Sequence, residues 1–166
     1  MEIKNKVAES GIITIDLEDL LPKEAAVIFD IRDYLFMEMI LKEKDFREAL
    51  KNHDWEIYSG KNVTITCTAD AIVPLWAYML ITSYLQPVAN FISVGDTEEL
   101  KKRLLLKKIN EMNTEELTGA RVVVKGCGDM QVSDYAYAEI TRVLLPVVKS
   151  IMYGEPCSTV PVFKKK

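Results

Sequence analysis

The chain has 166 residues, enough for one domain with a hydrophobic core. Hydrophobic residues make up 49% of it and charged residues 28%, which excludes a largely disordered or low-complexity chain. The formal net charge of -4 argues against nucleic acid as a partner, because nucleic acid is bound mainly by clustered lysine and arginine.

The amino-terminal residues and the cysteines indicate a compartment. The first residues are charged where a secretory signal would have its apolar core. No apolar run reaches the roughly 20 residues that span a bilayer, and residues 71–85 come nearest. We therefore expect a cytoplasmic protein without a membrane segment, in which cysteines are reduced. The three cysteines are odd in number and far apart, so they do not indicate a disulfide framework.

Strand and helix patterns alternate along the first half of the chain. Residues 12–17 alternate apolar and polar side chains, as a half-buried strand does. Residues 25–30 are apolar almost throughout, which is typical of a strand covered on both faces. A helical period then runs from Arg32 to about Asn52.

The middle of the chain continues this alternation. A strand at residues 62–66 leads into Cys67, and Pro74 precedes a helix over residues 75–85. Because that helix is apolar nearly all round, we expect it to be buried or to lie at a subunit contact. A third strand at residues 91–94 leads into a capping box and a basic helix that ends near Glu111.

The last part of the chain contains a glycine-bracketed thiol. Residues 121–125 predict a buried strand that ends in Gly-Cys-Gly, with Cys127 at its centre. The pattern then predicts a long helix over residues 133–153, kinked at Pro146, followed by a proline-containing tail over residues 157–166.

The alternation of strands and helices predicts an α/β fold. We expect a three-layer sandwich with right-handed crossovers around a mostly parallel sheet, built as a single domain over residues 1–166. Residues 12–17 should pair at one edge of this sheet, where an antiparallel pairing is possible.

A candidate site follows from this fold, because ligands of open α/β sheets bind beyond the carboxyl ends of the strands. Two parallel strands that each end at a cysteine would place Cys67 and Cys127 along one edge of one sheet. The four segments expected at this edge are Asp30, residues 67–70, residues 95–96 and residues 126–129.

Each cysteine also has a carboxylate two or three residues away. The pairs are Cys67 with Asp70, Cys127 with Asp129, and Cys157 with Glu155. Thiolates with carboxylates can hold zinc or iron. A helix over residues 133–153 would carry the chain about 30 Å away. Cys157 would then reach the other thiols only through a folded-back tail or from a second subunit. Buried cysteines that act as small hydrophobes, and a reactive thiol, remain alternatives.

Other residues point to structural roles. His53 is the only histidine, so any Cys–His pair must use it, but its place after a predicted helix favours a capping role. The usual dinucleotide and P-loop glycine motifs do not occur in the sequence. The basic residues 101–108 are interpreted as a solvated helix face, and the lysines at 164–166 as a contribution to solubility.

Several segments resemble a bacterial protein family, domain of unknown function 2480 (DUF2480), almost from end to end. They are FDIR at residues 29–32, KEKDFR at 42–47, HDW at 53–55, TCTADAIVP at 66–74, KGCGD at 125–129 and YGEPCSTVP at 153–161. The resemblance implies a role near iron–sulfur cluster assembly, since genes of this family tend to lie beside the sulfur-mobilisation machinery. All three cysteines lie in these segments, which favours a shared role for them.

Three hypotheses follow for the function. The first is an accessory protein, not necessarily an enzyme, that binds zinc or iron or assists iron–sulfur assembly proteins. Its ligands would be Cys67, Cys127 and Cys157, with Asp70, Asp129 and Glu155 as auxiliary groups. The second is a thiol enzyme or sulfur acceptor with Cys127 as the nucleophile. The third is a non-catalytic binding module, in which the helix over residues 75–85 forms a homodimer or docking surface.

Overall fold

The computed structural model describes residues 11–126, 128, 131–155 and 157–166. Within these residues there are four α-helices and seven β-strands, and the strands form two sheets in which most neighbouring strands are parallel. The predicted α/β class is therefore confirmed. The chain divides into two compact units. Unit 1 consists of Met1–Leu21 with Leu105–Lys166, and unit 2 of Pro22–Leu104.

Unit 1 contains the four-stranded sheet A, with strand order β1-β5-β6-β7. Its strands are β1 (Ile12–Asp16), β5 (Arg121–Lys125), β6 (Ser150–Glu155) and β7 (Ser158–Lys164). Strand β1 lies at an edge, as expected, but it pairs parallel with β5, not antiparallel. Strands β5 and β6 are also parallel, and the antiparallel pair of the sheet is β6 with β7.

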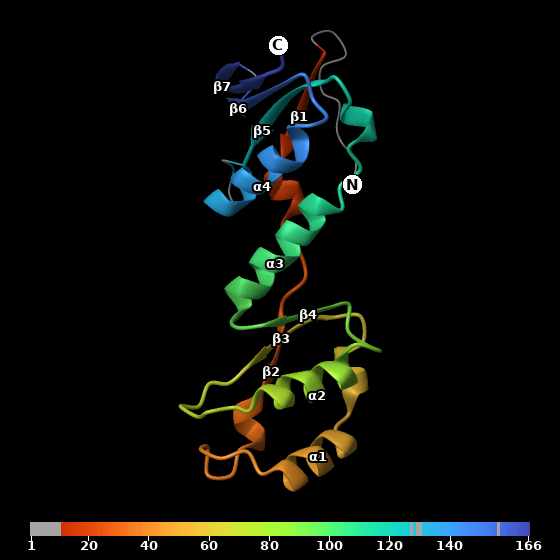
Figure 1. The fold of residues 1–166 in the computed structure, drawn as a ribbon, viewed down its shortest axis with the longest axis vertical. Helices are drawn as coiled ribbons and strands as arrows, with labels where there is room; N and C mark the ends of the chain where they lie inside the picture. Colours follow the sequence, from red (N-terminus) through yellow and green to blue (C-terminus); the bar gives the residue numbers. More distant parts are fainter. Residues whose placement is uncertain (1–10, 127, 129–130, 156) are drawn as a thin grey trace. The chain divides into compact units, whose positions relative to one another are not determined.

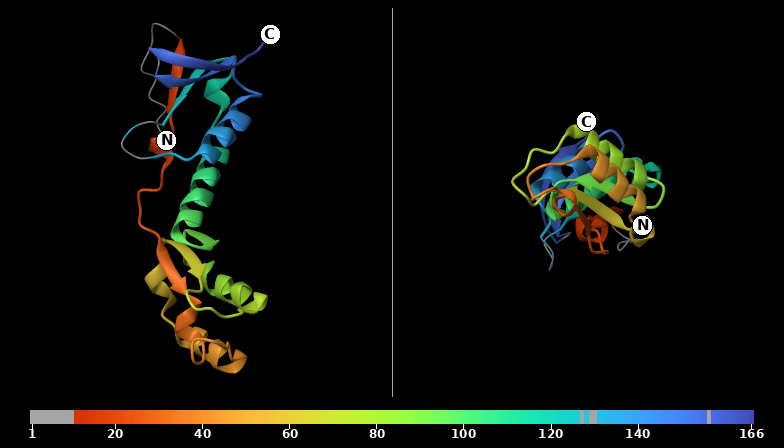
Figure 2. Two further views of the ribbon diagram at one scale, coloured as in Figure 1. Left: turned by 90° about the vertical axis from the view of Figure 1, so that its left-hand side faces the viewer. Right: turned by 90° about the horizontal axis from the view of Figure 1, so that it is seen from below.

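Helix α4 (Asp134–Leu144) connects β5 to β6 and covers one face of sheet A (Figure 2). Its buried residues Ala136, Ile140 and Leu144 are spaced four apart, which places them on one stripe of the helix. This stripe packs in one hydrophobic core with Val122 of β5 and Ile151 of β6.

The end of α4 corrects the prediction of a long kinked helix over residues 133–153. The helix stops at Leu144, two residues before Pro146, which has no N–H to donate and would clash with the preceding turn. The residues beyond form β6, and the supposed tail forms β7. Pro146 therefore ends the helix and does not kink it. Residues 150–155 pair with β5 as a strand, and a helix that continued past Pro146 could not make that pairing.

Unit 2 contains the three-stranded parallel sheet B, with strand order β2-β3-β4. Its strands are β2 (Val27–Asp30), β3 (Asn62–Thr66) and β4 (Phe91–Val94). Helices α1 (Glu43–Asn52) and α2 (Leu75–Leu85) lie on the same side of this sheet (Figure 1). Helix α3 (Thr97–Asn110) follows β4, and the boundary between the two units falls within its sequence.

The core of unit 2 is largely aromatic. Phe29 of β2 is buried and contacts four rings: it stacks on Tyr34 and Trp55, with centroids 5.1 and 5.5 Å away, and lies 5.8 Å from His53 and 6.1 Å from Tyr58. Aromatic contacts of this kind add to the free energy gained from burying their area.

The segment before α1 corrects the prediction of one helix from Arg32 to Asn52. A short 3-10 helix at Ile31–Tyr34 is followed by a tight turn, with a bridge between Phe36 and Ile40 and positive φ angles at Met37 (51°) and Glu38 (57°). Glu38 is held there by an ion pair of 2.8 Å with Arg32. The helix therefore begins only at Glu43.

Helix α2 has the predicted bounds, but its burial is one-sided. Ala77, Ile81 and Leu85 are fully buried, whereas Leu75 and Met79 are 81% and 74% exposed. Its predicted role at a subunit contact stays a prediction. Across the described ranges, no helix combines the length and the apolar character needed to cross a membrane.

Candidate functional site

The two strands that lead to Cys67 and Cys127 belong to different sheets. Strand β3, which precedes Cys67, lies in sheet B, and β5, which precedes Cys127, lies in sheet A. The prediction that both strands end at one edge of one sheet is therefore wrong. A buried parallel strand has the same apolar signature in any sheet, so the sequence pattern could not assign the strands to two sheets.

At the carboxyl edge of sheet B, the carboxylate of Asp30 has a structural role. It accepts hydrogen bonds from the backbone N–H of Arg32 (3.0 Å) and of Thr68 (3.1 Å), and from the Thr68 hydroxyl (2.5 Å). Burial opposes its charge, but these hydrogen bonds outweigh burial and lower the pKa of Asp30. Asp30 thus ties the end of β2 to the segment after β3.

Cys67 is half-buried at this edge, and its Sγ lies 3.6 Å from the carbonyl oxygen of Ala69. Asp70 is exposed. Burial raises the pKa of Tyr78 on α2, and the neighbouring Cys67 raises it further. This placement of Cys67, packed against the core of unit 2, agrees with a small buried hydrophobe.

His53 is part of the aromatic core of unit 2. Its backbone N–H donates to the Leu50 carbonyl at the end of α1, at 3.3 Å, but its imidazole does not cap the helix. The ring nitrogen Nδ1 lies 3.1 Å from the Tyr34 hydroxyl, and Nε2 is buried without a hydrogen-bond partner in the described part of the chain.

The carboxyl edge of sheet A brings together a group of charged and polar side chains. We call it the carboxyl-edge cluster, and it consists of Asp16, Glu18, Lys125, Tyr137 and Glu155. The ammonium of Lys125, at the end of β5, lies 3.5 Å from Asp16 Oδ2 at the end of β1 and 3.5 Å from Glu155 Oε1 at the end of β6. Burial opposes the charge of Lys125, but these two carboxylates outweigh it and raise its pKa.

Two glycines bracket the thiol in the sequence after β5, and each contacts a member of the cluster. A Cβ on Gly126 would lie 2.5 Å from the Tyr137 hydroxyl oxygen, and a Cβ on Gly128 would lie 2.5 Å from Glu18 Oε1. Only glycine admits polar side chains this close to the backbone. Cys127 and Asp129 lie outside the described residues.

Glu18 differs from the other carboxylates of the cluster. Its Oε1 is buried and has no hydrogen-bond partner among the residues that the structure describes. A buried carboxylate oxygen without a partner is costly in free energy. The cluster also holds three carboxylates, of Asp16, Glu18 and Glu155, against the one ammonium of Lys125, so its net charge favours a cation.

Cys157 lies at the same edge of the sheet. Val124 of β5 is in register with Tyr153 of β6, so the two parallel strands end side by side. Cys157 is exposed and follows the end of β6 by two residues, as Cys127 follows the end of β5. The predicted helix that would carry the chain about 30 Å away does not form, since β6 runs alongside β5 in place of its second half.

The sequence prediction included Glu155 but missed Asp16, Glu18, Lys125 and Tyr137. Asp16 is the last residue but one of the predicted strand over residues 12–17, so the sequence already placed it near a strand end. In an antiparallel pairing, Asp16 would lie at the amino-terminal end of β5. Only the parallel pairing brings Asp16 beside Lys125, at the carboxyl end of β5. In the described part of the chain, no group of three or more His, Cys, Asp and Glu residues is arranged as a metal site.

The chain is thus an α/β protein with two mostly parallel sheets and a carboxylate-rich cluster at the carboxyl edge of sheet A. A family model described as protein of unknown function (DUF2480) matches residues 1–165, and the chain belongs to this family. No curated protein and no solved structure matches it.

Proposed function

We propose that this protein binds a thiophilic metal ion, zinc or ferrous iron, at the carboxyl edge of sheet A through Cys127 and Cys157. The observation that carries this proposal is the parallel register of β5 and β6, each of which is followed two residues later by a cysteine. Neighbouring strands lie about 4.8 Å apart, which suits two thiolates that share one ion.

The carboxylates of the carboxyl-edge cluster support the proposal. Among the residues that the structure describes, a buried oxygen of Glu18 lacks a partner, and a cation or a group bound to it would satisfy that oxygen. Glu155 is exposed beside the turn that carries Cys157 and is available as a further oxygen ligand or hydrogen-bond acceptor. Carboxylate oxygens complete thiolate sites for both zinc and iron.

Holding or relaying a metal is sufficient for an accessory role, and no catalytic step is required. We extend the proposal to assistance in iron–sulfur cluster assembly, with the assembly proteins as partners. Cys67 belongs to unit 2 and to the other sheet, so its participation, together with that of Asp70, stays a prediction that the same experiment tests.

The test is elemental analysis with a visible spectrum, on untagged protein purified anaerobically without chelators. We expect near-stoichiometric zinc or iron in the wild type, and a charge-transfer band if thiolates bind iron. Cys127→Ser and Cys157→Ser should each lose most of the metal, and the metal content of Cys67→Ser decides whether Cys67 takes part. Full metal content in either of the first two variants would refute the proposal.

A second candidate is a sulfur acceptor with Cys127 as the nucleophile. Lys125 stands two residues before Cys127 in the sequence, and a cation close to a thiol stabilises its thiolate. This candidate predicts a metal-free protein in which iodoacetamide modifies Cys127 at a pH well below about 8, where an ordinary free thiol reacts only slowly. The half-buried Cys67 should label slowly and serves as the internal standard.

A homodimer is proposed for the exposed face of α2. Leu75 and Met79 are large apolar side chains that solvent reaches, together with Ile72 in the preceding loop. A Met79→Glu variant should then shift the sedimentation equilibrium from dimer toward monomer, whereas Gln131→Glu, which adds the same charge at an exposed position of unit 1, should have a smaller effect. A monomeric wild type would exclude the dimer.

A further inference from the structure

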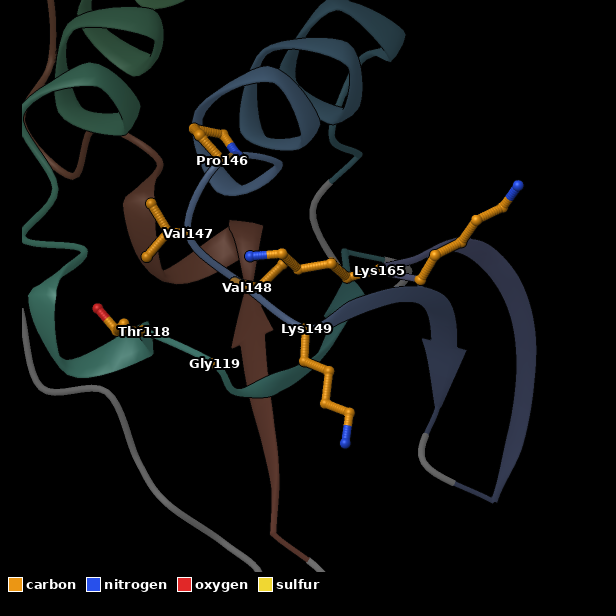
Figure 3. Close-up of a pocket in the computed structure, with 8 residues that line it drawn as sticks. Thr118, Gly119, Pro146, Val147, Val148, Lys149 and Lys165 are labelled. Carbon is orange, nitrogen blue, oxygen red and sulfur yellow. The ribbon is translucent and has the colours of Figure 1, made fainter.

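A second site is suggested by a pocket at the amino-terminal edge of sheet A, opposite the carboxyl-edge cluster (Figure 3). Three segments of unit 1 line it: Thr118 and Gly119 before β5, residues 146–149 before β6, and residues 165–166 after β7. Its volume is about 600 Å³, which is in the range of small-molecule sites.

Backbone hydrogen bonds hold the three segments together. The N–H of Lys165 donates to the carbonyl of Lys149 at 2.8 Å, and the N–H of Gly119 donates to the carbonyl of Val147 at 2.9 Å. Gly119 has φ of +71°, a conformation that suits glycine. The pocket is therefore formed by main-chain positions that sheet A itself fixes.

The charged residues that line the pocket are all lysines. Lys149, Lys165 and Lys166 line it, and none of them is ion-paired with a carboxylate of the described chain. The lining segments themselves contain no aspartate or glutamate, and the nearest acids in sequence to Thr118 are Glu115 and Glu116. This positive region belongs to a chain whose formal net charge is -4.

The basic helix α3 provides a contrast. Its Lys101, Arg103 and Lys107 are paired with glutamates three or four residues away on the same helix or at its end, at 2.9, 2.8 and 2.5 Å. Their charges are largely compensated within the helix. The lysines of the pocket have no such partners in the described ranges, so their field is available to an anion from solution.

We propose that this pocket binds a small organic anion with two or more negative charges, a phosphate ester or a polycarboxylate. Three ammonium groups can neutralise several charges, and the side chains of Lys149 and Lys165 leave neighbouring positions on flexible stems (Figure 3). The volume exceeds that of an inorganic ion, and Pro146 and Val147 offer an apolar wall for an organic body. A nucleic acid would require an extended basic stripe.

The proposal is tested by isothermal titration of the full chain at low ionic strength with pyrophosphate, ADP, citrate and acetate. We expect a Kd below about 1 mM for at least one multivalent probe and no detectable binding of acetate. Pyrophosphate and ADP report a phosphate preference, and citrate a carboxylate preference. Either preference, or both, supports the proposal.

Variants locate the binding. Lys149→Gln with Lys165→Gln should weaken the tightest probe at least about tenfold, because charge-assisted hydrogen bonds are lost. Lys44→Gln with Lys51→Gln removes the same charge from exposed positions outside the pocket and should change the Kd less than about twofold. Equal weakening in both double variants, or no binding of any probe, would overturn the proposal. Either result is independent of the metal content of the protein.

Discussion

The carboxylate of Glu18 lies directly against the backbone of Gly128, where a Cβ would sit 2.5 Å from Oε1 and 2.6 Å from Oε2. This contact links the segment after β1 to the segment after β5, on the carboxyl side of Cys127. The atoms that a Cβ would meet are the far end of a flexible side chain, so substitution at Gly128 should move the carboxylate and not the fold.

Gly128→Ala therefore tests the role of Glu18 in the proposed metal site. Because the displaced carboxylate can turn toward solvent, we expect little change in thermal stability but a weaker affinity for zinc, by about 10- to 100-fold, as loss of a supporting group around a metal usually causes. Competition with a chelating indicator measures the affinity, and circular dichroism measures the melting temperature.

Two further variants provide the comparison for Gly128→Ala. Glu18→Gln should reproduce its effect, while Asp19→Asn, which removes a charge from the exposed neighbouring residue, should leave the zinc affinity unchanged. Wild-type affinity in both Gly128→Ala and Glu18→Gln would show that the carboxylate takes no part in binding.

Several elements could be predicted from sequence because local signals mark their ends. Pro74 precedes α2, and Asp96 accepts a hydrogen bond of 2.8 Å from the N–H of Glu99 at the start of α3, so both helices begin where the sequence indicates. Strand β6 could not be predicted in this way. Pro146 is compatible with a kink or an end, and the choice depends on pairing with β5, which is distant in sequence.

The candidate site was predictable only in part for the same reason. The sequence predicts that Cys127 follows a strand and that Glu155 accompanies Cys157. The ends of β5 and β6 lie at one edge only because β6 is a strand parallel to β5. Asp16 lies at this edge as well only because β1 is also parallel to β5. Such pairings are set by the packing of whole elements and leave no signature in a window of residues.

Phe29→Ala should strongly destabilise unit 2. Phe29 is 1% exposed and contacts Tyr34, Trp55, His53 and Tyr58, so its removal leaves a cavity among rigid rings. We expect the free energy of unfolding to fall by about 3–5 kcal/mol. Both tryptophans lie in unit 2, so urea titration followed by tryptophan fluorescence reports on this unit.

The neighbouring residue provides the control for this prediction. Ile28 is 51% exposed and projects from the other face of β2, so Ile28→Ala should cost less than about 1 kcal/mol. Similar losses in the two variants would mean that the aromatic cluster does not hold unit 2 together.

Met37→Gly should stabilise the turn before α1. Met37 has φ of 51°, which costs a residue with a side chain about 1–2 kcal/mol, and at 74% exposure it loses little packing when truncated. Part of this gain is offset by the greater freedom of glycine in the unfolded chain, so we expect a net increase of about 0.5–1 kcal/mol in the free energy of unfolding.

Met39→Gly is the matched control for the turn. Met39 is 66% exposed but is not among the residues with positive φ, so glycine relieves no strain there and only adds freedom to the unfolded chain. It should lower the free energy of unfolding by up to about 1 kcal/mol. Equal effects of the two substitutions would contradict the strain at Met37.

The stability of unit 2 should decrease at alkaline pH because of Tyr58. Burial raises the pKa of Tyr58 to about 12, and Tyr34 and Asp33 act in the same direction. In the unfolded chain a tyrosine ionises near pH 10, as it does in model peptides. Between about pH 10 and 12 the unfolded state therefore loses a proton that the folded state keeps, and the equilibrium shifts toward unfolding.

The contribution of the protonated Tyr58 to the free energy of unfolding is thus fully present below about pH 10 and is lost as the pH rises toward 12. The free energy of unfolding should fall by at most about 1.4 kcal/mol per pH unit for this one group. The pKa values of Tyr34 and Tyr78 are also raised by burial, so their slopes add in the same direction. Urea titrations across this range, followed by tryptophan fluorescence, give the wild-type slope. Phenylalanine at position 58 has no hydroxyl proton to lose, so Tyr58→Phe should reduce the slope by the contribution of one ionising group. Tyr153→Phe, in unit 1, should leave the slope unchanged. A Tyr58→Phe slope equal to that of the wild type would mean that the Tyr58 hydroxyl ionises as readily in the folded chain as in the unfolded one.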